Sequence, residues 1–132
     1  ARGDPVSSEP LTPARGAAIS LYGLAAIFFE EFDAESGLAA LTIAQALDPD
    51  DDAARLAFAQ QHNRLGNTRL AQAALARVAD TSVYAATARN TNAWIVFESG
   101  DEDAALVLAG VNAEGGDLRA RRSLADMYRN MG

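Results

Sequence analysis

The chain has 132 residues, a formal net charge of −7 and no cysteine. This length suits one domain, and the acidic balance disfavours general binding to nucleic acid or to an anionic membrane surface. The absence of cysteine excludes disulfides, thiolate metal sites and cysteine nucleophiles, and no apolar stretch approaches the roughly 20 residues of a membrane-spanning helix.

Residues 1–15 contain three prolines and few apolar side chains, which predicts an irregular N-terminal arm. The arm includes Arg2-Gly3-Asp4, a tripeptide known from adhesion ligands, which we attribute to chance. From Gly16 onward, alanine and leucine are abundant and apolar residues recur with helical spacing. Glycine, asparagine and Asp-Pro punctuation divides this region, and no stretch alternates with period two as a strand would. We predict helices over residues 16–31, 34–47, 51–65, 68–79, 83–98, 102–112 and 117–131.

A recurrence of about 34 residues runs through the helical region. A small residue recurs in the first helix of each predicted pair, at Ala25, Ala59, Ala93 and Ala125. The second helices carry small residues at the same interval, at Gly37, Ala71 and Ala105. Small residues let paired helices approach closely, glycine in the turn supplies positive φ, and a following Asp or Asn caps the next helix. One hairpin cannot bury both of its faces, so we expect the hairpins to stack.

This pattern resembles the tetratricopeptide repeat. The first unit carries the residues of that family's pattern in order, namely Leu21, Leu24, Ala25, Phe28, Gly37, Leu41, Ala44 and Pro49. The resemblance covers residues 18–132, and the sequence is similar to tetratricopeptide regions of larger proteins from high-GC bacteria. It departs from the pattern where Arg55, Arg89 and Arg121 replace the usual tryptophan. The last stretch also resembles a Sel1-type repeat, which has the same helical-hairpin architecture.

The resemblance implies an all-α fold, an antiparallel helical-hairpin superhelix of about seven helices. Residues 16–132 would form this domain, as three repeats and the first helix of a fourth. In the family, the first helices line a concave face that binds extended peptides or a partner's helix. The residues carried onto this face are Tyr22, Ala26, Phe29, Leu56, Gln60, Asn63, Arg64, Asn90, Trp94, Phe97, Glu98, Arg119, Arg122, Asp126 and Arg129. We therefore expect a non-catalytic scaffold for a protein or peptide partner, with no cofactor.

Two single-copy side chains allow more than one interpretation. Trp94 is the only tryptophan; it could lie in the core, or it could be a partly exposed anchor in the groove. His62 is the only histidine. Because its repeat position is held elsewhere by apolar and aromatic residues, we expect it to be packed or half-buried and not to be catalytic.

The last predicted helix carries a local basic stripe in an otherwise acidic chain. Arg119, Arg122 and Arg129 fall near one face of this helix. The stripe could hold a carboxylate by bidentate pairing. The alternative is that these arginines pair with Asp117, with Asp126 or with acids of the preceding unit.

No part of the sequence assembles a nucleophile, a base and an orienting group, so we expect that the protein is not an enzyme. There is no glycine-rich phosphate loop and no G-x-S-x-G motif. Asp48, Asp50 and Asp52 alternate as the first ligands of an EF-hand do, yet the sixth and twelfth positions hold alanine. We interpret these acids, and the run Asp101-Glu102-Asp103, as helix-terminal residues and not as metal ligands.

The recurrence breaks off at Gly132, in the turn where a second helix would follow. The last helix would then leave an apolar flank uncovered, made of Leu124, Met127, Tyr128 and Met131. An alternative function is therefore a structural segment of a larger repeat protein, which stacks on further repeats or on another copy. The sequence indicates a soluble chain and leaves both the bacterial cytoplasm and the periplasm open.

Overall fold

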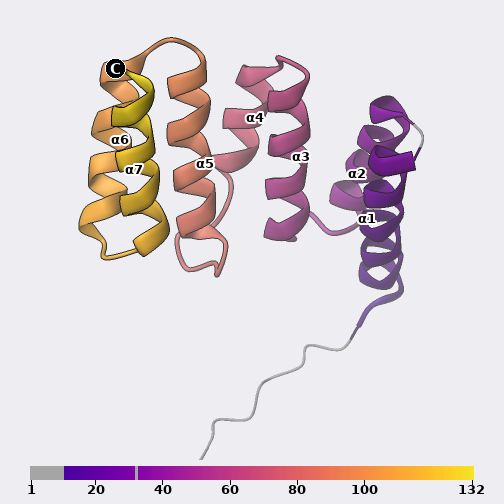
Figure 1. Ribbon diagram of the computed structural model, residues 1–132. Helices are drawn as coiled ribbons and strands as arrows, with labels where there is room; N and C mark the ends of the chain where they lie inside the picture. The colour runs from indigo at the N-terminus through magenta and orange to yellow at the C-terminus, as the bar shows by residue number, and fades with distance from the viewer. Residues whose placement is uncertain (1–10, 32) are drawn as a thin grey trace, which may run out of the picture. The chain divides into compact units, whose positions relative to one another are not determined.

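The structure is a computed structural model that describes residues 11–31 and 33–132. These residues form helices joined by turns and contain no strand, which confirms the all-α prediction (Figure 1). The helices are α1 (Pro13–Glu31), α2 (Ala34–Leu47), α3 (Asp52–Arg64), α4 (Thr68–Leu75), α5 (Ala85–Glu98), α6 (Glu102–Glu114) and α7 (Leu118–Asn130). None of these seven helices in the described chain has the length and apolar character that a membrane crossing requires. The Arg2-Gly3-Asp4 tripeptide lies outside the described residues.

Contacts divide the chain into two compact units, Ala1–Pro49 and Asp50–Gly132. The first unit contains the antiparallel pair α1 and α2, which pack along each other. The second unit contains the other five helices.

Helix α1 begins at Pro13, three residues before the predicted start at Gly16, so the predicted arm over residues 1–15 is too long. Proline suits the first helical position because no backbone N–H is needed there. The Thr12 hydroxyl oxygen accepts a hydrogen bond from the Arg15 backbone N–H at 3.2 Å and so caps the helix. The side chain of Arg15 also reaches α2, with its Nε atom 3.6 Å from Asp48 Oδ2. Residues 13–15 are therefore part of the hairpin and not of the arm.

The close approach of α1 and α2 depends on Gly37. A Cβ atom on Gly37 would lie only 2.5 to 2.7 Å from ring atoms of Phe29. The two helices are otherwise held by buried small residues and by Leu41, which is 1% exposed. Phe29, a predicted groove residue, thus packs against α2 within its own hairpin.

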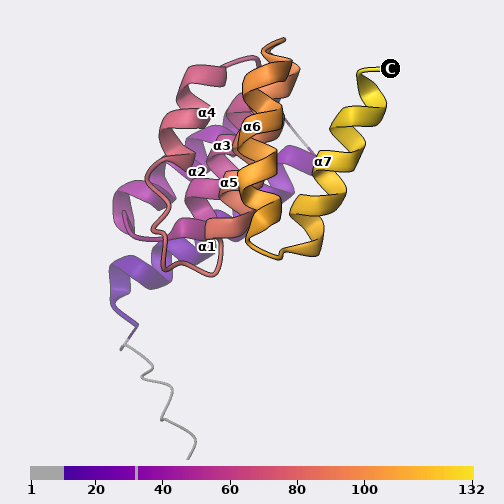
Figure 2. The same cartoon turned by 90° about the vertical axis from the view of Figure 1, so that its left-hand side faces the viewer.

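In the second unit, each helix packs on the next one along the chain, and the contact between α4 and α5 is less extensive than the others. The alternate helices α3, α5 and α7 also touch in succession, so that they lie side by side (Figure 1). Figure 2 shows the other end of this arrangement, where α6 lies beside α7. The recurrence explains this packing, because its small residues are fully buried between the helices. They are Ala59, Ala71, Ala93 and Ala105, each 0% exposed.

The fourth occurrence of the recurrence differs from the prediction. Ala125 is exposed, whereas Met127 is fully buried in a cluster with Ala93, Ala105 and Ala109. The small residue was expected to face a second helix, but no described helix covers that side of α7. The predicted uncovered flank is therefore wrong for Met127 and for Leu124, which packs against the same cluster.

Helix α4 is shorter than predicted, ending at Leu75 and not near residue 79. Residues 76–84 form turns, in which Arg77 and Val78 donate backbone hydrogen bonds three residues back. The Arg77 carbonyl accepts a hydrogen bond from Arg55 Nη1 at 3.0 Å. This bond comes from α3, 22 residues earlier, and helical spacing cannot predict it.

The acidic runs serve as helix caps. The Asp51 carboxylate accepts hydrogen bonds from two backbone N–H groups at the start of α3, and the Asp101 carboxylate accepts one at the start of α6. The residue before Asp101 is Gly100, whose φ of 92° requires glycine. The interpretation of these runs as helix-terminal residues is confirmed at both positions.

Candidate functional site

A shallow hollow lies between α3 and α5, on the face where the alternate helices run side by side. Its lining consists of Gln60, Asn63, Arg64, Thr91, Trp94, Ile95 and Glu98. The positions follow helical spacing along each helix, so each set projects from one face of its helix. Five of the seven are residues that the resemblance placed in the groove.

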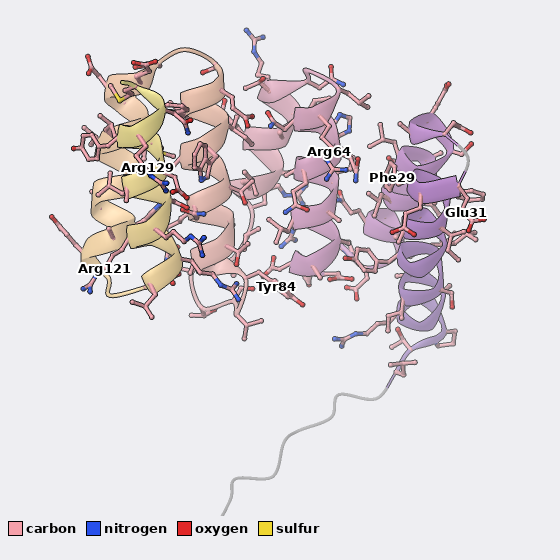
Figure 3. The ribbon with its side chains drawn as sticks, viewed as in Figure 1. Phe29, Glu31, Arg64, Tyr84, Arg121 and Arg129 are labelled. Carbon is pink, nitrogen blue, oxygen red and sulfur yellow. The ribbon has the colours of Figure 1, made fainter. Side chains whose placement is uncertain are left out.

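Two of these polar side chains join the helices across the hollow. Asn63 Nδ2 on α3 donates a hydrogen bond to Glu98 Oε2 on α5 at 2.9 Å. Gln60 and Arg64 lie on the same side of α3, and Figure 3 shows the guanidinium of Arg64 projecting from that helix. Neither Gln60 nor Arg64 makes a side-chain hydrogen bond or ion pair in the described chain, so both side chains are open to a partner.

Trp94 is half-buried and combines both interpretations that the sequence left open. Its indole Nε1 donates a hydrogen bond to Ser123 Oγ on α7 at 3.1 Å. Its ring meets Phe97 edge-to-face, with centroids 5.6 Å apart, and packs against the cluster around Met127. The remaining surface of the ring lines the hollow. Trp94 is thus fixed by the core on one side and accessible on the other.

The Trp94–Ser123 hydrogen bond brings one flank of α7 beside α5. The predicted basic stripe of Arg119, Arg122 and Arg129 follows helical spacing and lies on this flank with Asp126, next to Ser123. Arg129 pairs with Asp126 three residues earlier. The pairing alternative therefore holds for Arg129.

The other two arginines of the stripe differ. Arg119 and Arg122 are both exposed and make no ion pair in the described chain. Asp117, a predicted partner, instead caps α7, where its carboxylate accepts a hydrogen bond from the Arg119 backbone N–H at 2.9 Å. Both guanidinium groups are therefore available at the surface.

Arg121 lies on the opposite flank of α7. Its Nε atom donates to the Ala113 carbonyl oxygen of α6 at 3.4 Å, and Figure 3 shows its side chain pointing away from α5. The same helix thus carries exposed arginines on two sides, and Arg119 and Arg122 lie on the side next to Ser123.

Asn90 lies on α5, one turn before Trp94. Its Oδ1 atom is buried and has no hydrogen-bond partner within the described chain. Because solvent does not reach this oxygen, it is not placed to accept a hydrogen bond from a segment lying on the face. The assignment of Asn90 to the binding face therefore finds no support in this atom.

The other predicted groove residues lie elsewhere. Leu56 is in the core formed by α3, α4 and α5. Tyr22 is 36% exposed on α1, and Ala26 is exposed on the same helix; with Phe29, they belong to the first unit. His62 is half-buried, as expected, with its ring centroid 4.1 Å from that of Phe58.

Sequence reasoning missed three residues of this face. Thr91 and Ile95 line the hollow beside Trp94, and helical spacing around Trp94 was the signal that could have found them. Ser123, 8% exposed, is the one polar residue of the described chain that is buried as a whole. Its place in the buried stripe of α7, between Ala120 and Met127, marked it as a residue that needs a hydrogen-bond partner.

The lining of the hollow, taken together with the groove residues predicted on α7, includes six ionisable side chains. The cations are Arg64, Arg119, Arg122 and Arg129, and the anions are Glu98 and Asp126. Four positive and two negative charges leave the face at +2, although the chain carries −7. Three or more potential metal ligands do not gather anywhere in the described residues.

No family model matches the sequence, and no curated protein matches it.

Proposed function

We propose that the chain is a non-catalytic scaffold that binds an extended protein segment along the face formed by α3, α5 and α7. One observation carries this proposal. Trp94 lines a hollow with part of its ring, while Ser123 and Phe97 hold the other part in place. A rigid, half-exposed tryptophan is a typical interface anchor, because little conformational entropy is lost when a partner covers it.

The polar side chains around Trp94 support a peptide ligand. Gln60 and Thr91 offer donors and acceptors for a main chain, and Arg64 offers guanidinium donors. The tetratricopeptide resemblance points to the same face and the same kind of ligand. The proposal assigns the face to binding alone, without a chemical step.

A displayed library of random dodecapeptides tests this function. We expect the folded chain to select peptides, and we expect each selected peptide to shift the fluorescence of Trp94, the only tryptophan. Gln60→Ala and Asn63→Ala should weaken the binding. The matched control is Arg69→Ala on α4, which is exposed and does not line this hollow. If the library yields no peptide that depends on Gln60 or Asn63, the proposed function is wrong.

Self-assembly is the second candidate, and it is favoured by exposed apolar side chains on α6 and α7. Val107, Val111 and Leu118 are 67%, 63% and 77% exposed. Exposed apolar side chains of this kind often mark interaction surfaces. Sedimentation over a range of concentrations distinguishes this function, since a chain that stays monomeric at every concentration does not assemble through these residues.

A further inference from the structure

We infer that the segment bound by this face carries acidic side chains, and that Arg119 and Arg122 pair with its carboxylates. This inference rests on the proposed function and names the chemistry of its ligand. The starting point is charge. Helix α7 contains four arginines and one aspartate, a net of +3 in 13 residues, whereas the chain as a whole carries −7.

Among the described residues, these two arginines have no acidic partner. Arg119 and Arg122 are three residues apart, so their side chains are neighbours on the helix surface and repel each other. Asp126 is spaced to pair with Arg122, but its carboxylate is held by Arg129. Asp117 is held by the backbone at the start of α7. An added carboxylate would relieve the repulsion and could accept two parallel hydrogen bonds from either guanidinium.

The arginines also belong to the helix that holds Trp94 in place. Ser123 lies between Arg119 and Arg122 on one side and Asp126 on the other in the sequence of α7, and its hydroxyl holds Trp94. Arg64 adds a third unpaired guanidinium on the far side of the hollow. An apolar or aromatic side chain of the ligand would therefore cover Trp94, with acidic side chains near it in sequence.

A short acidic segment fits this face better than a nucleic acid does. A nucleic acid extends its negative charge beyond the face and is repelled by the rest of an acidic chain. A short segment is exposed mainly to the local charge of +2, because salt screens charges more than about 10 Å away at 0.1 M ionic strength.

The dodecapeptide selection tests the inference when it is repeated with the variant Arg119→Glu/Arg122→Glu. We expect peptides selected by the unchanged chain to be enriched in Asp and Glu over the starting library. Their affinity for the variant should be lower by a factor of about ten or more. Their affinity for the unchanged chain should fall as salt is raised from about 0.05 to about 0.5 M, because the Debye length shortens from ~14 to ~4 Å and screens the ion pairs. Arg121→Glu, on the other flank of the same helix, is the control for the single variants Arg119→Glu and Arg122→Glu, since each of the three reverses one arginine.

The outcomes separate the inference from the function on which it rests. Selected peptides without acidic enrichment, or peptides that bind the double variant as well as the unchanged chain, overturn the inference and leave the binding function standing. A loss with Arg121→Glu equal to the loss with Arg119→Glu or with Arg122→Glu also overturns it, because the effect would then be one of net charge. Displacement of the peptides by a single-stranded oligonucleotide of about 12 nucleotides, as strong as that by an acidic peptide, overturns the choice of ligand class. Failure to select any peptide removes the function itself.

Discussion

Trp94 and Ser123, 29 residues apart in the sequence, meet where α5 packs against α7, with the indole N–H donating to the serine hydroxyl. This bond satisfies Ser123, the one polar residue buried as a whole in the described chain, and fixes the orientation of the indole. The position of Trp94 in the hollow between α3 and α5 therefore depends on Ser123 of a third helix, α7.

Ser123→Ala should loosen the indole and destabilise the second unit. The indole N–H would lose its partner, and a lost hydrogen bond of this kind costs about 1 kcal/mol. We expect a lower midpoint of urea unfolding and a change in the emission maximum of Trp94. Ser99→Ala is the control, since the Ser99 hydroxyl is exposed and bonds only to the Val96 carbonyl of its own helix. An emission spectrum that Ser123→Ala leaves unchanged would contradict the proposed positioning of Trp94.

Gly37→Ala should destabilise the α1–α2 hairpin although alanine is the better helix former. The added methyl group would lie 2.5 Å from the nearest ring atom of Phe29, so the ring or the helices must move, at a cost of about 1 to 3 kcal/mol. The helix preference of alanine offsets about 1 kcal/mol of that cost.

Gly23→Ala is the matched control for this prediction. Gly23 lies in α1 of the same hairpin, and a Cβ atom there meets nothing within 4 Å. It should stabilise the chain by about 0.5 to 1 kcal/mol. Thermal unfolding followed by circular dichroism checks both variants, and a gain in stability with Gly37→Ala would show that the hairpin has room for the methyl group.

Arg55→Ala should free the turns between α4 and α5. The Arg55 guanidinium pairs with Asp52 and with Asp50, 3.6 Å away, and donates to the Arg77 carbonyl. Its side chain is only 11% exposed, and hydrogen bonds from a charged donor contribute about 1.5 to 3 kcal/mol. We expect faster amide exchange or protease cleavage in residues 76–84.

Arg55→Lys keeps the charge but lacks the planar fork, so it should restore only part of this protection. Arg69→Ala, which removes an exposed arginine of α4, is the control. Equal exchange rates in the Arg55→Ala chain and the unchanged chain would show that Arg55 does not stabilise these turns.

Stability should fall when the pH drops through the range in which histidine titrates. Burial lowers the pKa of His62 below its ordinary value of 6.5, because the charged imidazolium loses solvation. The unfolded chain therefore binds the proton first, and folding stability is fully present above pH 6.5 and is lost as the pH falls through the folded pKa.

His62→Gln removes this dependence, since the chain has a single histidine. Urea unfolding at pH 8 and pH 5 checks the prediction, with both chains compared at each pH. The difference in unfolding free energy between the two pH values should be smaller for His62→Gln. A larger difference for His62→Gln than for the unchanged chain would mean that a partner of His62 stabilises the protonated ring.

Local chemistry and periodicity made several structural predictions reliable. Helix α2 was predicted with both of its ends correct, because Asp33 caps its first turn and Asp48-Pro49 follows its last. The burial of Ala59 and Ala93 followed from their spacing of 34 residues. The repeat register also placed Gln60, Asn63 and Trp94 on one face, because helical spacing decides which side chains share a side.

The sequence by itself therefore determined the helices, most of their ends to within one residue, and the face that carries Trp94, since these depend on residues within a few turns of one another. The tertiary structure decided three further features: the early end of α4, the burial of Met127 in place of Ala125, and the bond between Trp94 and Ser123. Each depends on which helix covers a given side chain and on a partner more than 20 residues away. Spacing along one helix carries no information about such a partner, because contact across helices is set by packing.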